Sequence, residues 1–179
     1  MAPRVIVVNG GSSSGKTTIV RQLQGMLAEP WLAASIDDFV DSLPPALQAS
    51  TAGFDVAAGG AVVVGEVFRR LEAAWMAGIA ATVRAGAPVV VDDVFLGAAE
   101  SQQRWRAALA GLPVAWVGVH CDPAVAGRRE ASRGDREPGM AVRQATEVHR
   151  GVGYDVEVDT TRTSAADCAR TVVAELRLR

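Results

Sequence analysis

The 179-residue sequence contains a single lysine, Lys16, and the rest of its positive charge is arginine. Lys plus Arg number 18 and Asp plus Glu number 20, which leaves a formal net charge of −2. Because the chain has no excess of positive charge, it has no general attraction for nucleic acid, and we expect no such partner. The lone lysine also excludes the guanine-nucleotide switches, since these need a further lysine in an N-K-x-D segment.

Long apolar runs are missing as well. Hydrophobic residues make up 49% of the chain, but no stretch approaches the roughly 20 consecutive apolar residues that span a membrane. The first residues do not form a charged segment with an apolar run and a cleavage site, because Val5 to Val8 leads directly into glycines and serines. We therefore expect a cytoplasmic protein without a membrane partner, while its oligomeric state stays open.

Cysteine and histidine are scarce, with two residues of each. Cys121 and Cys168 lack C-x-x-C spacing, and neither His120 nor His149 stands in a recognisable catalytic spacing. These counts disfavour disulfide scaffolds, zinc sites and thiol or imidazole catalysis. We expect reduced thiols and structural histidines.

A phosphate-binding loop is the strongest motif present. Residues Gly10 to Thr17 fit the pattern G-x-x-x-x-G-K-T and follow the β-branched run Val5 to Val8. Glycines allow backbone N–H groups to surround a polyphosphate at the N-terminus of the next helix, so a merely flexible turn is disfavoured. Lys16 is expected to contact the β- and γ-phosphates, and Thr17 to offer a hydroxyl to Mg²⁺. The predicted ATP-binding residues of this loop are Gly10, Gly11, Ser12, Ser13, Ser14, Gly15, Lys16, Thr17 and Thr18.

Strand and helix patterns alternate along the whole chain. Apolar runs predict buried strands at 5–8, 31–36, 88–93, 113–119 and 156–158. Helical spacing predicts helices after Thr18 and at 66–84, 99–110, 140–150 and 164–176, and Pro123 opens a further predicted helix. Such alternation predicts one α/β domain over residues 1–179, with a five-stranded parallel sheet between two layers of helices.

Aspartates follow two of the predicted strands, Asp37 and Asp38 after the second, Asp92 and Asp93 after the third. In parallel sheets, residues just beyond the strand ends line the ligand crevice. Asp37 is the candidate catalytic residue that orients an acceptor hydroxyl, with Asp38 as the alternative. Asp92 is the candidate Mg²⁺ ligand in a Walker B arrangement, although these acids could instead cap the next helix.

Two further segments carry predictions about substrate binding. Residues 39–65 are apolar but broken by prolines and glycines, which indicates either a substrate-covering insertion or a surface excursion with a small hairpin. Residues 124–150 form a predicted lid with its flanking helices, whose arginines suit phosphate contacts and whose glycines allow motion. Arg133 and Arg136 are candidate catalytic residues and Arg128 a candidate nucleotide contact; a solvated face is the alternative, most of all for Arg129.

This set of residues suffices for phosphoryl transfer, which depends mainly on positioning and charge stabilisation. The first hypothesis is therefore an ATP-dependent small-molecule kinase. A nucleotide-dependent ATPase switch is the second hypothesis; motors of that class usually place Glu after the Walker B Asp, whereas Asp93 stands here. A nucleotide or nucleoside kinase is the third, on fold analogy.

Several strings resemble the chloramphenicol phosphotransferase family over nearly the whole chain. They are Asn9 to Lys16, Pro30 to Leu32, Asp37 before Leu43-Pro44, Asp92 to Gly97, Trp116 to Val119, Arg133 to Arg136 and Tyr154 to Thr160. The resemblance implies an adenylate-kinase-like P-loop kinase that transfers the γ-phosphate of ATP to the chloramphenicol 3-hydroxyl. It also implies that Asp37 acts on the hydroxyl and that Arg133 and Arg136 belong to a lid.

Overall fold

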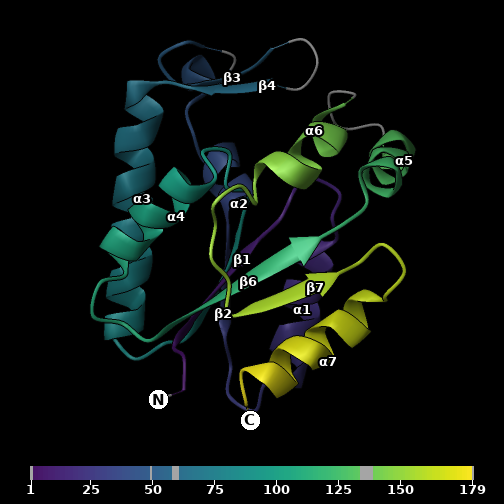
Figure 1. Cartoon of the computed structure of the whole chain (residues 1–179). Coiled ribbons are helices and arrows are strands. Elements are labelled where there is room, and N and C mark those ends of the chain that lie inside the picture. Colours follow the sequence, from purple (N-terminus) through teal and green to yellow (C-terminus); the bar gives the residue numbers. More distant parts are fainter. Residues whose placement is uncertain (1, 49, 58–60, 134–138, 179) are drawn as a thin grey trace.

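The computed structural model describes residues 2–48, 50–57, 61–133 and 139–178. Its centre is a sheet of five parallel strands in the order β2-β5-β1-β6-β7 (Figure 1). The strands are β1 (Val5–Asn9), β2 (Leu32–Ser35), β5 (Val89–Asp93), β6 (Val114–His120) and β7 (Val156–Asp159). The predicted five-stranded parallel sheet is thus confirmed, and the strand with the P-loop, β1, occupies its middle.

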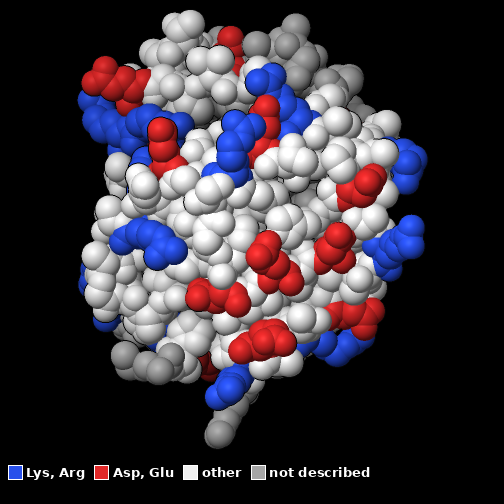
Figure 2. All heavy atoms as spheres, viewed as in Figure 1, with Lys and Arg blue, Asp and Glu red and all other residues white. Residues whose placement is uncertain are grey.

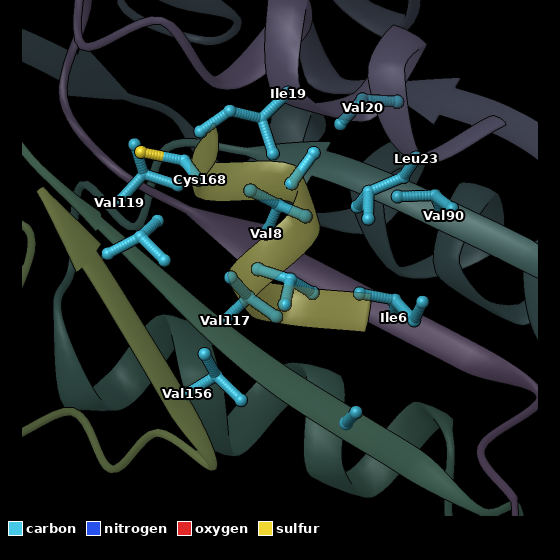
Figure 3. Close-up of a cluster of buried hydrophobic side chains, with 14 of the residues drawn as sticks. Ile6, Val8, Ile19, Val20, Leu23, Val90, Val117, Val119, Val156 and Cys168 are labelled. Carbon is cyan, nitrogen blue, oxygen red and sulfur yellow. The ribbon is translucent and has the colours of Figure 1, made fainter. Parts of the chain in front are cut away.

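Helices cover both faces of the sheet because side chains alternate along each strand. On one face, Ile6 and Val8 of β1 pack against α1 (Lys16–Met26) and α7 (Ala165–Glu175), as Figure 3 shows. On the other face, Val5 and Val7 pack against α3 (Glu66–Arg84) and α4 (Ala99–Ala108). The result is the three-layer fold that the alternation of patterns predicts.

The second strand differs from its prediction. A buried strand over 31–36 was expected, but β2 ends at Ser35 and stands at the edge of the sheet, where Leu32 is 52% exposed. Ile36 instead begins α2 (Ile36–Asp41), whose first turn is capped by Ser35 Oγ accepting from the Asp37 N–H. An apolar run cannot distinguish an edge strand from a central one, because strand order is a property of the whole sheet.

Residues that follow α2 build a small second core beyond the carboxyl end of the sheet. A 3₁₀ turn, η1 (Pro45–Leu47), leads into an antiparallel hairpin of β3 (Phe54–Ala57) and β4 (Ala61–Val64), at the top of Figure 1. Phe39 of α2 stacks on Trp75 of α3 with ring centroids 5.2 Å apart. Trp75 is therefore a packing residue of this second core.

The helices α5 (Pro123–Arg133) and α6 (Met140–Glu147) form a pair joined by a buried carboxylate. Glu130 of α5 accepts hydrogen bonds from the N–H groups of Gly139, at 2.8 Å, and Ala141, at 2.7 Å. Both donors belong to the first turn of α6, where backbone N–H groups have no partner within the helix. Glu130 thus fixes the start of α6 against α5.

The face of the molecule seen in Figure 2 is mixed in charge. On the face seen in Figure 2, acidic and basic side chains are interspersed among uncharged residues. None of the helices in the described ranges combines the length and the apolar character that crossing a bilayer requires.

Candidate phosphoryl-transfer site

The P-loop runs from the end of β1 into α1 and is packed tightly from two sides. A Cβ on Gly10 would lie 2.5 Å from the carbonyl oxygen of Val119 in β6, and one on Gly11 would lie 3.0 Å from the backbone of Gln144 in α6. Gly15 has a φ of 92°, which L side chains rarely adopt. Neighbouring elements as well as backbone conformation therefore require these glycines.

Lys16, Thr17 and Asp92 meet at the base of the loop. Parallel pairing of β1 with β5 places Asp92 beside Val8. Thr17 Oγ1 donates to Asp92 Oδ2 at 2.6 Å, and Lys16 Nζ lies 3.8 Å from Asp92 Oδ1 and donates to the Gly11 carbonyl at 3.1 Å. The hydroxyl and carboxylate oxygens are the hard ligands that Mg²⁺ prefers, so these residues fit that ion. No cluster of three or more His, Cys, Asp or Glu suited to a metal occurs in the described part of the chain.

Two serine hydroxyls of the loop are left without partners. Ser13 Oγ and Ser14 Oγ are buried and make no hydrogen bond within the described residues. Leaving such groups unpaired costs about 1–3 kcal/mol each. A bound phosphate would supply acceptors for both hydroxyls, so the loop fits a polyphosphate.

Asp93 has a different environment from Asp92. Its carboxylate accepts from Trp105 Nε1 at 2.5 Å and from the Val94 N–H at 2.6 Å. Burial raises the pKa of Asp93 to about 6, although both hydrogen bonds act to lower it. Asp93 therefore connects β5 to α4, whereas Asp92 faces Lys16 and Thr17.

A cavity of about 500 Å³ extends from the P-loop to α2 and the hairpin. Asp37, Val40 and Asp41 of α2 line it at helical spacing of three and four residues, which places them on one face of the helix. Asp38 is exposed and lies outside the lining formed by the described residues. Asp41 was not singled out by the sequence analysis, because residues 39–65 were read as an irregular insertion, whereas residues 36–41 form a helix.

The remaining wall of the cavity is mostly apolar. It includes Phe54 of β3, Val62 of β4, Phe68 of α3 and Leu96 after β5. Residues 39–65 thus contribute to the cavity from α2 and from both strands of the hairpin.

In α5, Arg129, for which a solvated face was the expected alternative, contacts the region of the P-loop. Arg128 is exposed, whereas Arg129 reaches the P-loop region. Arg129 Nη2 donates to the Thr160 carbonyl at 2.7 Å, and its Nη1 lies 3.5 Å from the Ser13 carbonyl. Arg133 is the last residue of α5, and Arg136 lies outside the described residues. The helical phase of α5, which a sequence pattern of charged residues does not define, decides which arginine faces the loop.

Two other residues that contact the P-loop went unrecognised in the sequence. The Ser12 N–H donates to Gln144 Oε1 of α6 at 2.8 Å, and Thr160 Oγ1 donates to the Ser14 carbonyl at 2.6 Å. Thr160 is the last residue of the string Tyr154 to Thr160, one of those on which the family resemblance rests, so the sequence did contain a signal for this residue. Gln144 had no such signal.

The histidines lie beside the loop in a packed cluster. Their rings stack with centroids 4.0 Å apart, and His149 Nδ1 is hydrogen bonded to the Tyr154 hydroxyl at 2.6 Å. Asn9, at the end of β1, donates to the same hydroxyl at 2.5 Å. Burial, and to a smaller degree the neighbouring His120, lowers the pKa of His149 to about 4. These contacts agree with the structural role expected for both histidines.

A P-loop at the end of the central strand, facing an acid-lined cavity, defines a phosphotransferase of the P-loop kinase class. The chain belongs to the chloramphenicol phosphotransferase-like family, whose model matches residues 3–177. Members of this class phosphorylate small molecules, so the general activity predicted from the sequence is supported.

Relatives and solved structures agree with this assignment. A Mycobacterium tuberculosis protein described provisionally as an O-phosphotransferase is 32% identical over 184 residues, which cover 93% of this chain and 79% of that protein. A sugar kinase from Janibacter has a TM-score of 0.73 at 18% identity, covering 98% of this chain and 95% of its own. The M. tuberculosis APS kinase, solved with AMPPNP and APS, has a TM-score of 0.66 at 16% identity, covering 98% of each chain. At these identities the two structures show the shared fold.

Proposed function

We propose that this protein transfers the γ-phosphate of ATP to a hydroxyl group of a small molecule, and that chloramphenicol, at its 3-hydroxyl, is the acceptor to test first. The observation that carries the proposal is that residues of the P-loop, Asp37 and a group of apolar residues all line the same cavity. Donor and acceptor could then meet in one space. Membership in the chloramphenicol phosphotransferase-like family supports the choice of acceptor.

On the donor side, backbone N–H groups of the P-loop and Lys16 hold the phosphates, with the unpaired hydroxyls of Ser13 and Ser14 as further donors. Thr17 and Asp92 would hold Mg²⁺, which when bound neutralises charge on the β- and γ-phosphates. Arg133 and Arg136 are proposed to stabilise the transferring phosphoryl group, and Arg128 to contact the nucleotide.

On the acceptor side, Asp37 orients the hydroxyl toward the γ-phosphorus. The hydroxyl oxygen forms the new bond to phosphorus while the bond to the β–γ bridging oxygen breaks, and ADP leaves. The hydroxyl proton passes to the Asp37 carboxylate. Because catalysis of this kind rests on alignment, the position of Asp37 on the capped first turn of α2 is what makes it suitable.

Residues 39–65 are proposed to select the acceptor. Val40, Phe54 and Val62 offer an apolar surface suited to a ring, and Asp41 adds a second carboxylate one turn from Asp37. An acceptor with an apolar body and more than one polar group matches this lining.

The direct test is incubation of the purified protein with Mg²⁺-ATP and chloramphenicol, followed by mass spectrometry. We expect a product heavier by one phosphoryl group. A panel of nucleosides and other hydroxylated antibiotics would identify a different acceptor. Rapid ATP hydrolysis without any acceptor, raised strongly by a protein partner, would contradict the proposal and favour a nucleotide-dependent switch.

A further inference from the structure

Two glutamines in helices are buried to the same degree but use their amide groups differently. Gln102 of α4 and Gln144 of α6 are each 5% exposed. Gln102 uses both ends of its amide on one residue, since Nε2 donates to the Gly153 carbonyl at 2.6 Å and Oε1 accepts from the Gly153 N–H at 3.1 Å. Gln144 uses only Oε1, on the Ser12 N–H. Its Nε2 has no hydrogen-bond partner in the described part of the molecule.

The orientation of the Gln144 amide is determined by chemistry. A backbone N–H can only donate, so the atom 2.8 Å from Ser12 N must be the carbonyl oxygen, and the other end of the amide must be the NH₂ group. A side chain with one end held in this way keeps its donor end in a fixed direction.

The backbone that carries Gln144 is also fixed. Gly11 approaches the backbone of Gln144 so closely that a Cβ would lie 3.0 Å away, and Glu130 holds the first turn of α6. The backbone from which the Gln144 side chain extends is therefore held against the P-loop.

The donor end of Gln144 has access to the cavity. Gln144 lines the cavity together with Lys16 and Asp37. Its Nε2 is not fully buried, so a ligand in the cavity can reach it. A buried glutamine that is 5% exposed and keeps an unused donor against a ligand cavity is best explained by an oxygen acceptor on the ligand.

We propose that Gln144 is a specificity-determining residue of the transfer reaction, which anchors the P-loop through Oε1 and donates a hydrogen bond from Nε2 to an oxygen atom of the acceptor molecule. The inference rests on the proposed function, because it names a contact with the acceptor of that reaction. It assigns the acceptor an oxygen that lies on the P-loop side of the cavity, while Asp37 accepts from its hydroxyl.

Two substitutions of Gln144 distinguish the role of the acceptor oxygen, Oε1, from the role of the donor nitrogen, Nε2. Gln144→Glu keeps an oxygen for the Ser12 N–H but has no donor, whereas Gln144→Met removes both with little change in volume. Gln102→Met is the matched control, because it removes an equally buried amide that does not line the cavity. Steady-state kinetics with Mg²⁺-ATP and chloramphenicol, and calorimetric binding of each, are measured for the three variants and the unmodified protein.

For Gln144→Glu we expect the Kd for chloramphenicol, measured without nucleotide, to rise about tenfold, the equivalent of about 1.4 kcal/mol. The new carboxylate also lies beside the P-loop, so it should weaken ATP binding by repelling the phosphates. Gln144→Met should weaken both ligands. Gln102→Met should lower the melting temperature and leave both affinities unchanged. Unchanged chloramphenicol affinity in Gln144→Glu, measured without nucleotide, would overturn the inference.

Failure of the proposed function has a different signature. If the unmodified protein binds chloramphenicol without phosphorylating it, the proposed transfer is wrong, while weaker binding by Gln144→Glu still supports the contact. If chloramphenicol neither binds nor reacts, the contact is tested with the acceptor that the antibiotic and nucleoside panel identifies, by the same comparison of variants.

Discussion

At the scale of single residues, Lys16 shows why the chain keeps one ammonium among its arginines. The side chain is buried, bonded to the Gly11 carbonyl and 3.8 Å from an Asp92 oxygen. A guanidinium is planar and presents its donors in a rigid fork, whereas an ammonium is compact and donates in three directions. The interior of the P-loop therefore suits lysine, and arginine would need space that Asp92 and Gly11 occupy.

Substitution of Lys16 by alanine removes the positive charge expected to contact the phosphates. We expect Lys16→Ala to reduce turnover by at least ~100-fold and to weaken ATP binding. The reason is that the negative charge of the phosphates loses the Lys16 ammonium in the bound substrate as well as in the transition state. Initial rates of ADP formation together with calorimetric ATP binding measure the two effects. Full turnover in this variant would remove Lys16 from the mechanism.

Asp37 and Asp38 provide a matched pair, since they are identical neighbours and only Asp37 lines the cavity. Asp37→Asn should reduce turnover by at least ~100-fold with nearly unchanged ATP affinity, because the acceptor hydroxyl loses its orienting carboxylate. Asp38→Asn should stay within about twofold of the original rate, as expected for an exposed surface residue. A larger loss of turnover in Asp38→Asn than in Asp37→Asn would assign the orienting role to Asp38. A loss of ATP affinity in Asp37→Asn as large as its loss of turnover would indicate that Asp37 belongs to a metal site.

At the scale of secondary-structure elements, the hairpin of β3 and β4 presents alternate residues to different environments. Val62 lines the cavity, while Val63 is 52% exposed. This follows from the period of two along a strand, and it makes the hairpin one wall of the acceptor site that we propose.

Truncation of these two valines tests the role of the hairpin. Val62→Ala should raise the KM for chloramphenicol about 5- to 10-fold, through loss of two methyl groups from the apolar wall, with little change in the KM for ATP. Val63→Ala should change neither constant. Equal effects of the two substitutions would mean that the hairpin acts through its stability and not through contact with the acceptor.

The pairing of α5 with α6 gives a prediction about stability. Glu130→Ala should lower the free energy of unfolding by about 3 kcal/mol, because two buried N–H groups of the first turn of α6 lose a charged acceptor. Glu147→Gln breaks only the exposed pair with Arg143, and should cost less than about 0.5 kcal/mol. Urea unfolding of both variants checks the difference, and similar costs would show that the contacts of Glu130 contribute little.

At the scale of the whole molecule, two buried groups have opposite effects on the pH dependence of stability. The pKa of Asp93 is raised from 3.8 to about 6, so the folded protein keeps a proton that the unfolded chain releases, and stability falls as pH rises through this range. The pKa of His149 is lowered from 6.5 to about 4, so the unfolded chain binds the extra proton, and stability rises over nearly the same range. Their contributions largely cancel.

Removal of one group should reveal the other. Relative to the unmodified protein, Asp93→Asn should make the free energy of unfolding rise more steeply between pH 4 and pH 6, by about 3 kcal/mol over the interval. His149→Gln should change the slope in the opposite direction. Urea unfolding at half-unit pH steps measures both, and parallel curves for all three proteins would contradict the assignment.

Comparison of the sequence with the fold separates local from long-range information. The predicted bounds of α3, Glu66 to Arg84, agree with the structure, and so does the strand before the P-loop. These features depend on residues adjacent in the chain, through hydrophobic periodicity, capping and turn formation. The edge position of β2 and the start of α2 at Ile36 could not be recognised in this way, because both depend on which strands pair.

The sequence by itself determined that this chain is a P-loop α/β protein, since strand, loop, lysine and helix are consecutive residues whose conformation is local. Only the tertiary structure decided which side chains complete the surroundings of that loop. Ser12 meets Gln144 across 132 positions and Ser13 meets Arg129 across 116. Contacts of this range depend on the order of the strands and the rotation of α5 and α6 about their axes, which arise when the helices pack against the sheet.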